Sequence, residues 1–151
     1  MADRAYVAEN EVERKRLASL VARLSDRDLA HPMPGGWTVA SVLGHIAFWD
    51  QRIIALVEQW RKAGVGTPPK ALDDGNVVDW INDATKPLLL AVPPRHAADL
   101  TLGIAESTDR TVAELSDDFL AANDKAGSPV NVHRAPHRRE HIDEIEAALR
   151  S

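Results

Sequence analysis

The chain of 151 residues contains no cysteine, and this absence excludes several kinds of site at once. Without thiols the chain can form no disulfide, no thiolate zinc site and no cysteine nucleophile. The absence is also compatible with a reducing compartment. Metal binding or catalysis by this chain must therefore depend on imidazole, carboxylate or other side chains.

Long hydrophobic runs, an apolar leader and an excess of basic residues are lacking as well. No apolar run approaches the roughly 20 residues that cross a bilayer, and the charged N-terminal segment MADRAYVAENEVERKR has no signal-peptide core. The net charge is −5 without a basic stripe, which disfavours binding to nucleic-acid phosphates. We therefore expect a cytoplasmic protein that acts on neither membranes nor nucleic acids.

Apolar residues recur at helical spacing through most of the chain, and no segment shows the alternation typical of a strand. The pattern predicts an all-α fold, a four-helix bundle that forms a single domain over residues 1–151. A shorter helix is expected over residues 77–92, between the second and third long helices, with Pro87 kinking or dividing it. The long helices are expected over residues 5–24, 38–63, 95–115 and from Pro136 to the end.

The motif L-S-D-x-x-L-A occurs twice, at residues 24–30 and 115–121. Each copy follows a long amphipathic segment and precedes a turn-rich stretch. Such a motif is typical of a capping turn, and it is also compatible with a bundle built from two related helix pairs.

Apolar residues in the second long helix leave room for a homodimer. Ile54 and Val57 are expected to lie exposed on this helix. A contact between these helices in two copies of the chain would cover them.

Histidines carry the clearest functional signal. His137 and His141 are separated by four residues in a helical segment, so both rings can turn toward one point. His45 lies in the apolar second helix and supplies a third imidazole. Three neutral imidazoles with one open position are typical of a catalytic metal site. His133 precedes Pro136 in loop or first-turn geometry, so we expect it at the entrance of the site or in a supporting role.

Each histidine also has an ordinary explanation. Taken alone, His45 is better explained as a core histidine with a hydrogen bond to a carbonyl or carboxylate. His137 and His141 could lie on a solvated helix face. The segment HRREH also matches the H-x-x-E-H pattern of inverted zinc peptidases, with Glu140 as the base. The chain ends ten residues after His141 without a suitable third ligand, so we reject the peptidase interpretation.

Four further residues are candidates to support the ligands or to line a substrate pocket. Glu144 could orient a ligating imidazole through its free N–H. Arg52 lies two turns after His45 and could contact an anionic substrate or cover the edge of the core. Trp80 and Asn82 belong to a polar and aromatic region that a capped surface loop with one packed tryptophan would explain equally well.

Two segments resemble the signatures of a known family, the DinB-like superfamily. The segment GWTVASVLGHIAFWD at residues 36–50 resembles its second-helix signature, and His137-x-x-Glu140-His141-Ile142 resembles its last-helix signature. The superfamily includes the N-terminal metal domain of mycothiol-dependent maleylpyruvate isomerase and the bacillithiol transferases. The resemblance implies a bundle with up-down-down-up connection, often dimeric, and a divalent metal held by His45, His137 and His141.

Three functional hypotheses follow. The first is a metal-dependent transferase or isomerase that activates a low-molecular-weight thiol for attack on a small electrophile, since a metal deprotonates a coordinating thiol. The second is a non-catalytic metal or small-ligand binding protein involved in stress response, and the third a dimeric scaffold with a vestigial site. Zinc is the expected ion because three imidazoles and one water complete a tetrahedral site, although nickel or iron would also accept imidazoles.

Overall fold

The computed structural model describes residues 2–151. Over this range the chain forms seven α-helices and one two-stranded sheet. The expectation of an all-α chain is therefore confirmed, apart from one small hairpin. None of the helices in the described range combines the length and apolar character that spanning a bilayer requires.

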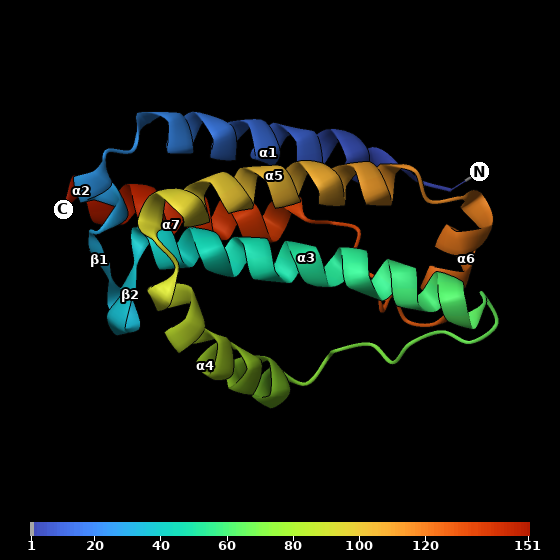
Figure 1. The fold of residues 1–151 in the computed structure, drawn as a ribbon. Helices are drawn as coiled ribbons and strands as arrows, with labels where there is room; N and C mark the ends of the chain where they lie inside the picture. The colour runs from blue at the N-terminus through green and yellow to red at the C-terminus, as the bar shows by residue number, and fades with distance from the viewer. Residues whose placement is uncertain (1) are drawn as a thin grey trace.

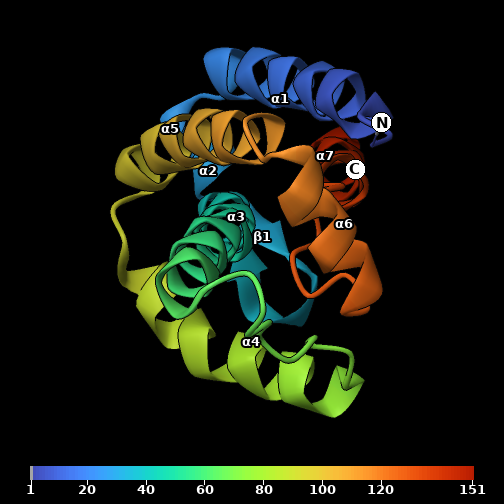
Figure 2. The ribbon, with the colours of Figure 1, turned by 90° about the vertical axis from the view of Figure 1, so that its right-hand side faces the viewer.

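Four long helices build the body of the molecule: α1 (Ala5–Arg23), α3 (Val39–Ala63), α5 (Pro94–Ala113) and α7 (Ala135–Arg150). Helix α3 packs mainly on α5, and α1 packs on both α5 and α7. Helices α1 and α7 run in one direction along the molecule, and α3 and α5 run in the other (Figure 1). The end-on view in Figure 2 shows these helices grouped together, with α4 outside the group.

Two clusters of buried apolar residues fill the space between the long helices. One includes Leu20, Leu43 and Ile142, and the other includes Tyr6 and Trp60. Val57 belongs to the second cluster and is fully buried, while Ile54 is half-buried. The expectation that Val57 lies exposed is therefore wrong, because this face of α3 packs into the core.

Hydroxyl side chains determine where several helices begin. Thr38 and Ser41 form a reciprocal capping box at the start of α3, with each hydroxyl accepting the other residue's backbone N–H at 3.1 and 2.8 Å. Ser25 and Ser116 cap α2 (Asp26–Leu29) and α6 (Asp117–Lys125) in the same manner as N-cap acceptors. The repeated L-S-D motif is thus a helix start, and two stretches expected as turns contain short helices.

A hairpin precedes α3 and was not expected from the sequence. Strands β1 (Pro32–Met33) and β2 (Trp37–Thr38) pair antiparallel around the 3₁₀ turn η1 (Pro34–Gly36). Gly35 and Gly36 both have positive φ there, at 75° and 80°, which favours glycine. Two-residue strands are too short to show an alternating pattern.

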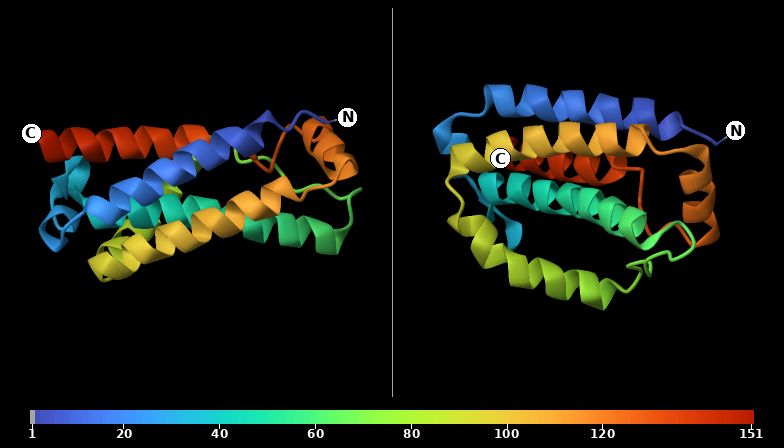
Figure 3. Two further views of the ribbon diagram at one scale, coloured as in Figure 1. Left: turned by 90° about the horizontal axis from the view of Figure 1, so that it is seen from above. Right: turned by 45° about the vertical axis from the view of Figure 1, so that its right-hand side comes forward.

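Helix α4 (Gly75–Ala91) corresponds to the expected short helix and continues through Pro87, so the proline does not divide it. It contacts α3 and β2 but buries none of its residues. The Lys86 ammonium group donates to the carbonyl of Gly35 and lies 5.5 Å from the ring centre of Trp37. Figure 3 shows α4 as a separate arm connected to the body by loops. Its exposed apolar residues include Trp80 and Leu88.

Candidate metal centre

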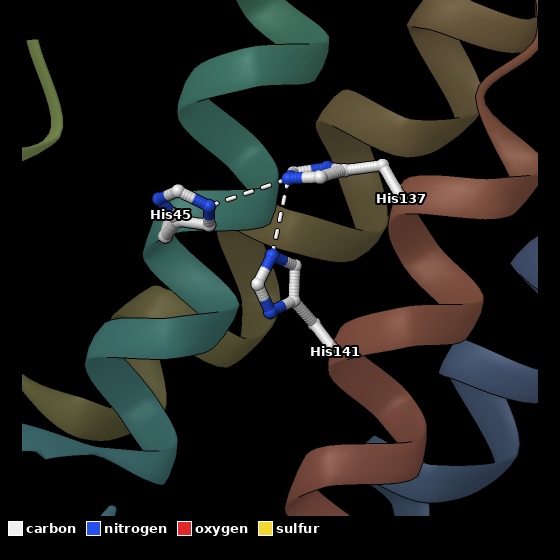
Figure 4. Close-up of side chains that lie close together, drawn as sticks. All are labelled: His45, His137 and His141. Carbon is white, nitrogen blue, oxygen red and sulfur yellow. Dashed lines mark hydrogen bonds between the residues drawn. The ribbon is translucent and has the colours of Figure 1, made fainter. Parts of the chain in front are cut away.

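Three histidine rings converge between α3 and α7. The Nε2 atom of His137 lies 3.3 Å from Nε2 of His45 and 3.1 Å from Nε2 of His141 (Figure 4). His45 comes from α3, and the other two lie one helical turn apart on α7, as the i, i+4 spacing predicts. Each ring offers one ligand atom, and these atoms all lie within 4.8 Å of one another.

The spacing of these nitrogens fits a small divalent ion. A tetrahedral ion with Zn–N bonds of about 2.0–2.1 Å places neighbouring ligand nitrogens about 3.3–3.4 Å apart. The two measured separations of 3.3 and 3.1 Å are close to this value. The cluster is therefore compatible with metal binding by three imidazoles, and such a set leaves further coordination positions for a small molecule.

The surroundings keep two of the rings neutral. Burial, together with a smaller contribution from the neighbouring His141, lowers the pKa of His45 from 6.5 to about 4. Burial also lowers the pKa of His137 to about 2, with added repulsion from His141 and Arg134. A neutral imidazole has a free ring-nitrogen lone pair, so both rings can act as ligands at neutral pH.

Hydrogen bonding orients the third ring. The Nδ1 atom of His141 lies 3.0 Å from Oε2 of Glu144, one turn later on α7. Because a carboxylate only accepts, Nδ1 is the donor in this contact, which leaves Nε2 as the ring nitrogen that can face the other two histidines. Within residues 2–151 the buried Nδ1 atoms of His45 and His137 have no hydrogen-bond partner. Glu144 thus supports His141 in a manner typical of metal-ligating histidines.

A buried ionic contact joins the two helices that carry the histidines. Asp50 on α3 accepts from the Nε of Arg134 at 2.8 Å and from Nε and Nη2 of Arg138 at 3.1 and 3.0 Å. Arg138 also binds Asp109 on α5 through both Nη atoms, at 3.0 and 2.8 Å. The Asp50 and Arg138 side chains are fully buried.

Sequence reasoning missed this network. The sequence offered two separate signals. One is a carboxylate at position 50 in a largely apolar helix, and the other is the pair of arginines in the segment RAPHR at residues 134–138. A buried carboxylate requires a partner, but neither pattern says that the two segments meet.

A cavity of about 1160 Å³ opens beside the three histidines. The hairpin, α3, α4, the loop before α7 and α7 itself all contribute to its lining. Trp37 and Trp49 lie edge-on to His45, with ring centres 5.7 and 6.5 Å away. Asn82 lines the cavity from α4 and accepts a hydrogen bond from Nε1 of Trp49 at 2.9 Å. The histidines thus lie on the wall of a space large enough for a small molecule.

The other candidate residues lie in different places. His133 is exposed and lies edge-on to Tyr6, lining a second cavity of about 600 Å³. Arg52 lies 5.8 Å from the ring centre of Trp49. Trp80 is 68% exposed on α4. In the described part of the chain, none of these three residues belongs to the lining of the larger cavity, whereas Glu144 and Asn82 do.

A comparison with models of known protein families identifies the family of the chain. The family model of the DinB superfamily matches residues 9–140, which is most of the sequence. The chain belongs to the DinB superfamily. The matched range of this DinB protein includes His45 and His137 and ends one residue before His141. Comparisons with curated proteins and with solved structures gave no significant match.

Proposed function

We propose that this DinB-superfamily protein binds a divalent metal ion through His45, His137 and His141 and acts as a transferase for a low-molecular-weight thiol. The observation that carries the proposal is the convergence of three Nε2 atoms on the wall of a cavity. Zinc is the ion we expect, because the nitrogen spacing is close to that of a tetrahedral zinc site. Nickel and iron are further candidates, since imidazole is a suitable ligand for both.

The proposed reaction joins a thiol to a small electrophile. A divalent ion held by the three histidines would lower the pKa of a coordinating thiol and so favour the thiolate at neutral pH. The thiol loses its proton to solvent water, its sulfur bonds to the electrophilic carbon, and the leaving group departs with the electron pair of the broken bond. Trp37 and Trp49 provide apolar walls, which restrict water around the reacting atoms.

The chain's own residues position the ligands. Glu144 holds the Nδ1 proton of His141 and directs the opposite nitrogen inward. Asp50 joins α3 to α7 through Arg134 and Arg138 and thereby holds His45 opposite the other two rings. We also propose that the four long helices form an up-down-down-up bundle, in which α3 and α7 lie side by side to share the site.

Metal content is the first test. Untagged protein purified without chelators should contain close to one metal ion per chain by elemental analysis. Alanine at position 45, 137 or 141 should remove most of it, with the helical circular-dichroism signal largely unchanged. His133→Ala is the matched control and should retain the metal, because His133 lies against Tyr6.

Turnover is the second test. Metal-loaded protein should accelerate formation of a thioether from a thiol and monochlorobimane, measured by chromatography, and His45→Ala should not. Stoichiometric metal without turnover of any thiol tested would contradict the transferase and leave a metal-binding protein. Protein that contains no metal and binds no added zinc, nickel or iron would contradict both the metal site and the transferase activity.

A further inference from the structure

One buried side chain in the cavity is only partly paired. Arg134 lines the cavity together with the three histidines and is 5% exposed. Its Nε donates to Oδ1 of Asp50 at 2.8 Å. Neither of its Nη atoms makes a hydrogen bond to any residue from 2 to 151. A buried guanidinium with unused donors facing a cavity can accept an anionic ligand group.

The charges of the surrounding network do not cancel. Three guanidinium groups meet two carboxylates: Arg14, Arg134 and Arg138 against Asp50 and Asp109. The network therefore has a formal net charge of +1. The surplus charge lies at the accessible end of the network, since the Arg14 side chain is 30% exposed. The buried Arg134 still has free Nη donors for an anion in the cavity.

Two neighbouring features add positive potential at the same place. Arg134 is the N-cap residue of α7, where the helix dipole is positive. Arg52 makes no ion pair with any described residue, and its pKa is lowered by burial and by the charge of Arg134. Both features favour a negative group on the Arg134 side of the cavity.

Acidic side chains also line the cavity. Its acidic rim, defined as Asp79, Asp83, Glu140 and Glu144, consists of exposed carboxylates on α4 and α7. A ligand with negative charge at both ends would be repelled at this rim. The cavity therefore favours a ligand with a single anionic group that enters first.

We propose that Arg134 binds the carboxylate of a small monoanionic or zwitterionic ligand whose reacting atom faces His45, His137 and His141. The proposal rests on the proposed function for the identity of the reacting atom, but not for the binding of the carboxylate. The planar guanidinium offers its free Nη edge to both carboxylate oxygens, while Asp50 holds its Nε. The ligand is thus a carboxylate-bearing thiol or a carboxylate-bearing electrophile.

The first arm of the test uses metal-free protein, so that it does not depend on the metal. Propionate and the neutral propionamide are titrated into ¹⁵N-labelled protein at constant ionic strength, and amide shifts are followed by NMR. We expect propionate to bind about tenfold more tightly or better, as a charge-assisted pair implies. Arg134→Gln should abolish this preference. Arg139→Gln, on the same helix but outside the cavity lining, should keep it.

Arg134→Gln could disturb folding, since it removes a buried partner of Asp50. Arg134→Lys preserves the charge near Asp50 but lacks the planar fork, and it should bind propionate several-fold more weakly than the unmodified chain. Equal binding of propionate and propionamide to the unmodified chain would overturn the proposal. So would an equal loss of preference in Arg134→Gln and Arg139→Gln.

The second arm uses cobalt-substituted protein and reads the visible absorption bands of the metal. Its probes are 3-mercaptopropionate, 2-mercaptoethanol and cysteamine, which carry a negative, a neutral and a positive group. Tightest binding of 3-mercaptopropionate, lost in Arg134→Gln, would assign the carboxylate to the thiol. No preference among the thiols, with propionate binding intact, would assign it to the electrophile. Tightest binding of cysteamine would overturn the proposal, because the acidic rim would then select the ligand.

Discussion

Asp50 is the residue on which the relative position of the histidines depends. It lies on α3 five residues after His45, and its carboxylate contacts two arginines that flank His137 on either side. Breaking a buried ion pair by removing one charge leaves the other charge uncompensated, which costs more than the pair contributes. The contacts of Asp50 with the two arginines therefore act mainly as a constraint on how α3 and α7 pack together.

We expect Asp50→Asn to lower the free energy of unfolding by about 3–5 kcal/mol, because Arg134 loses its carboxylate partner in a buried site. Urea denaturation followed by circular dichroism measures the change. Glu106→Gln breaks an exposed pair with Arg110 and should cost less than about 1 kcal/mol. Similar losses of unfolding free energy in the two variants would contradict the prediction, because the buried Asp50 pairs would then be no more costly to break than an exposed pair.

Glu144 has a narrower role than Asp50, because it contacts a single ring. We expect Glu144→Gln to reduce metal affinity by about 10–100-fold while leaving stability of the metal-free protein nearly unchanged. Competition with a chromogenic chelator measures the affinity. Glu140→Gln is the matched control, on the same helix and in the same cavity lining. If both variants lose affinity alike, the effect is one of cavity charge and not of ring orientation.

At the scale of elements, one close approach sets the position of α4 on α3. Gly44, next to His45, has no side chain, and a Cβ built there would lie 3.2 Å from Cδ2 of Leu89 on α4. This distance is shorter than normal carbon contacts. The absence of a side chain at Gly44 thus allows α4 to cover one side of the cavity.

Two glycine-to-alanine variants separate helix propensity from this contact. Gly103→Ala in α5 should raise the free energy of unfolding by about 0.5–1 kcal/mol, because a Cβ there meets nothing within 4 Å. Gly44→Ala should raise the free energy of unfolding by less than this, or lower it, because the side chain of Leu89 must move. Thermal unfolding measures both, and an equal gain in the two variants would contradict a tight contact between α3 and α4.

The helical elements were largely predictable, and the exceptions have local causes. Apolar spacing indicated the long helices, and Thr38 correctly marked the start of α3. The two short helices and the hairpin were missed because each is only a few residues long and shows no periodicity. Their capping serines were visible, but a cap alone does not say whether a turn or a helix follows.

At the scale of the whole molecule, metal-free protein should lose stability as the pH falls. His45 and His137 have folded-state pKa values of about 4 and about 2, below the usual 6.5. Between pH 6.5 and about 4 the unfolded chain therefore binds more protons than the folded chain, so the free energy of unfolding decreases as the pH falls. Above pH 6.5 these two groups contribute no further pH dependence.

Urea unfolding of chelator-treated protein at several pH values between 4 and 8 measures this effect. Each histidine adds at most about 1.4 kcal/mol per pH unit to the slope. His45→Gln removes one titrating group and should show a shallower slope, and His96→Gln, at an exposed position, is the control for replacing a histidine. Identical slopes for all three proteins would contradict the burial of a neutral His45.

The site was partly predictable for a physical reason. The i, i+4 spacing of His137 and His141 indicates a shared face because helix geometry is local. The packing of His45 against them, the position of Asp50 and the burial of Arg134 beside the cavity depend on how two distant segments meet. His133 was chosen from its position before Pro136 and Trp80 from a polar and aromatic region, and the fold places both outside the lining of the larger cavity within residues 2–151.

The sequence by itself determined the helical class, the starts of several helices and the pair of histidines on one face, because these follow from contacts within a few residues. The sequence also proposed His45 as the third imidazole, but only the tertiary structure decided how it packs against that pair, the buried ionic network and the cavity. Those features require α3 and α7 to pack side by side, with the hairpin and α4 around them. Their interactions are non-local, so no periodicity in the chain encodes them.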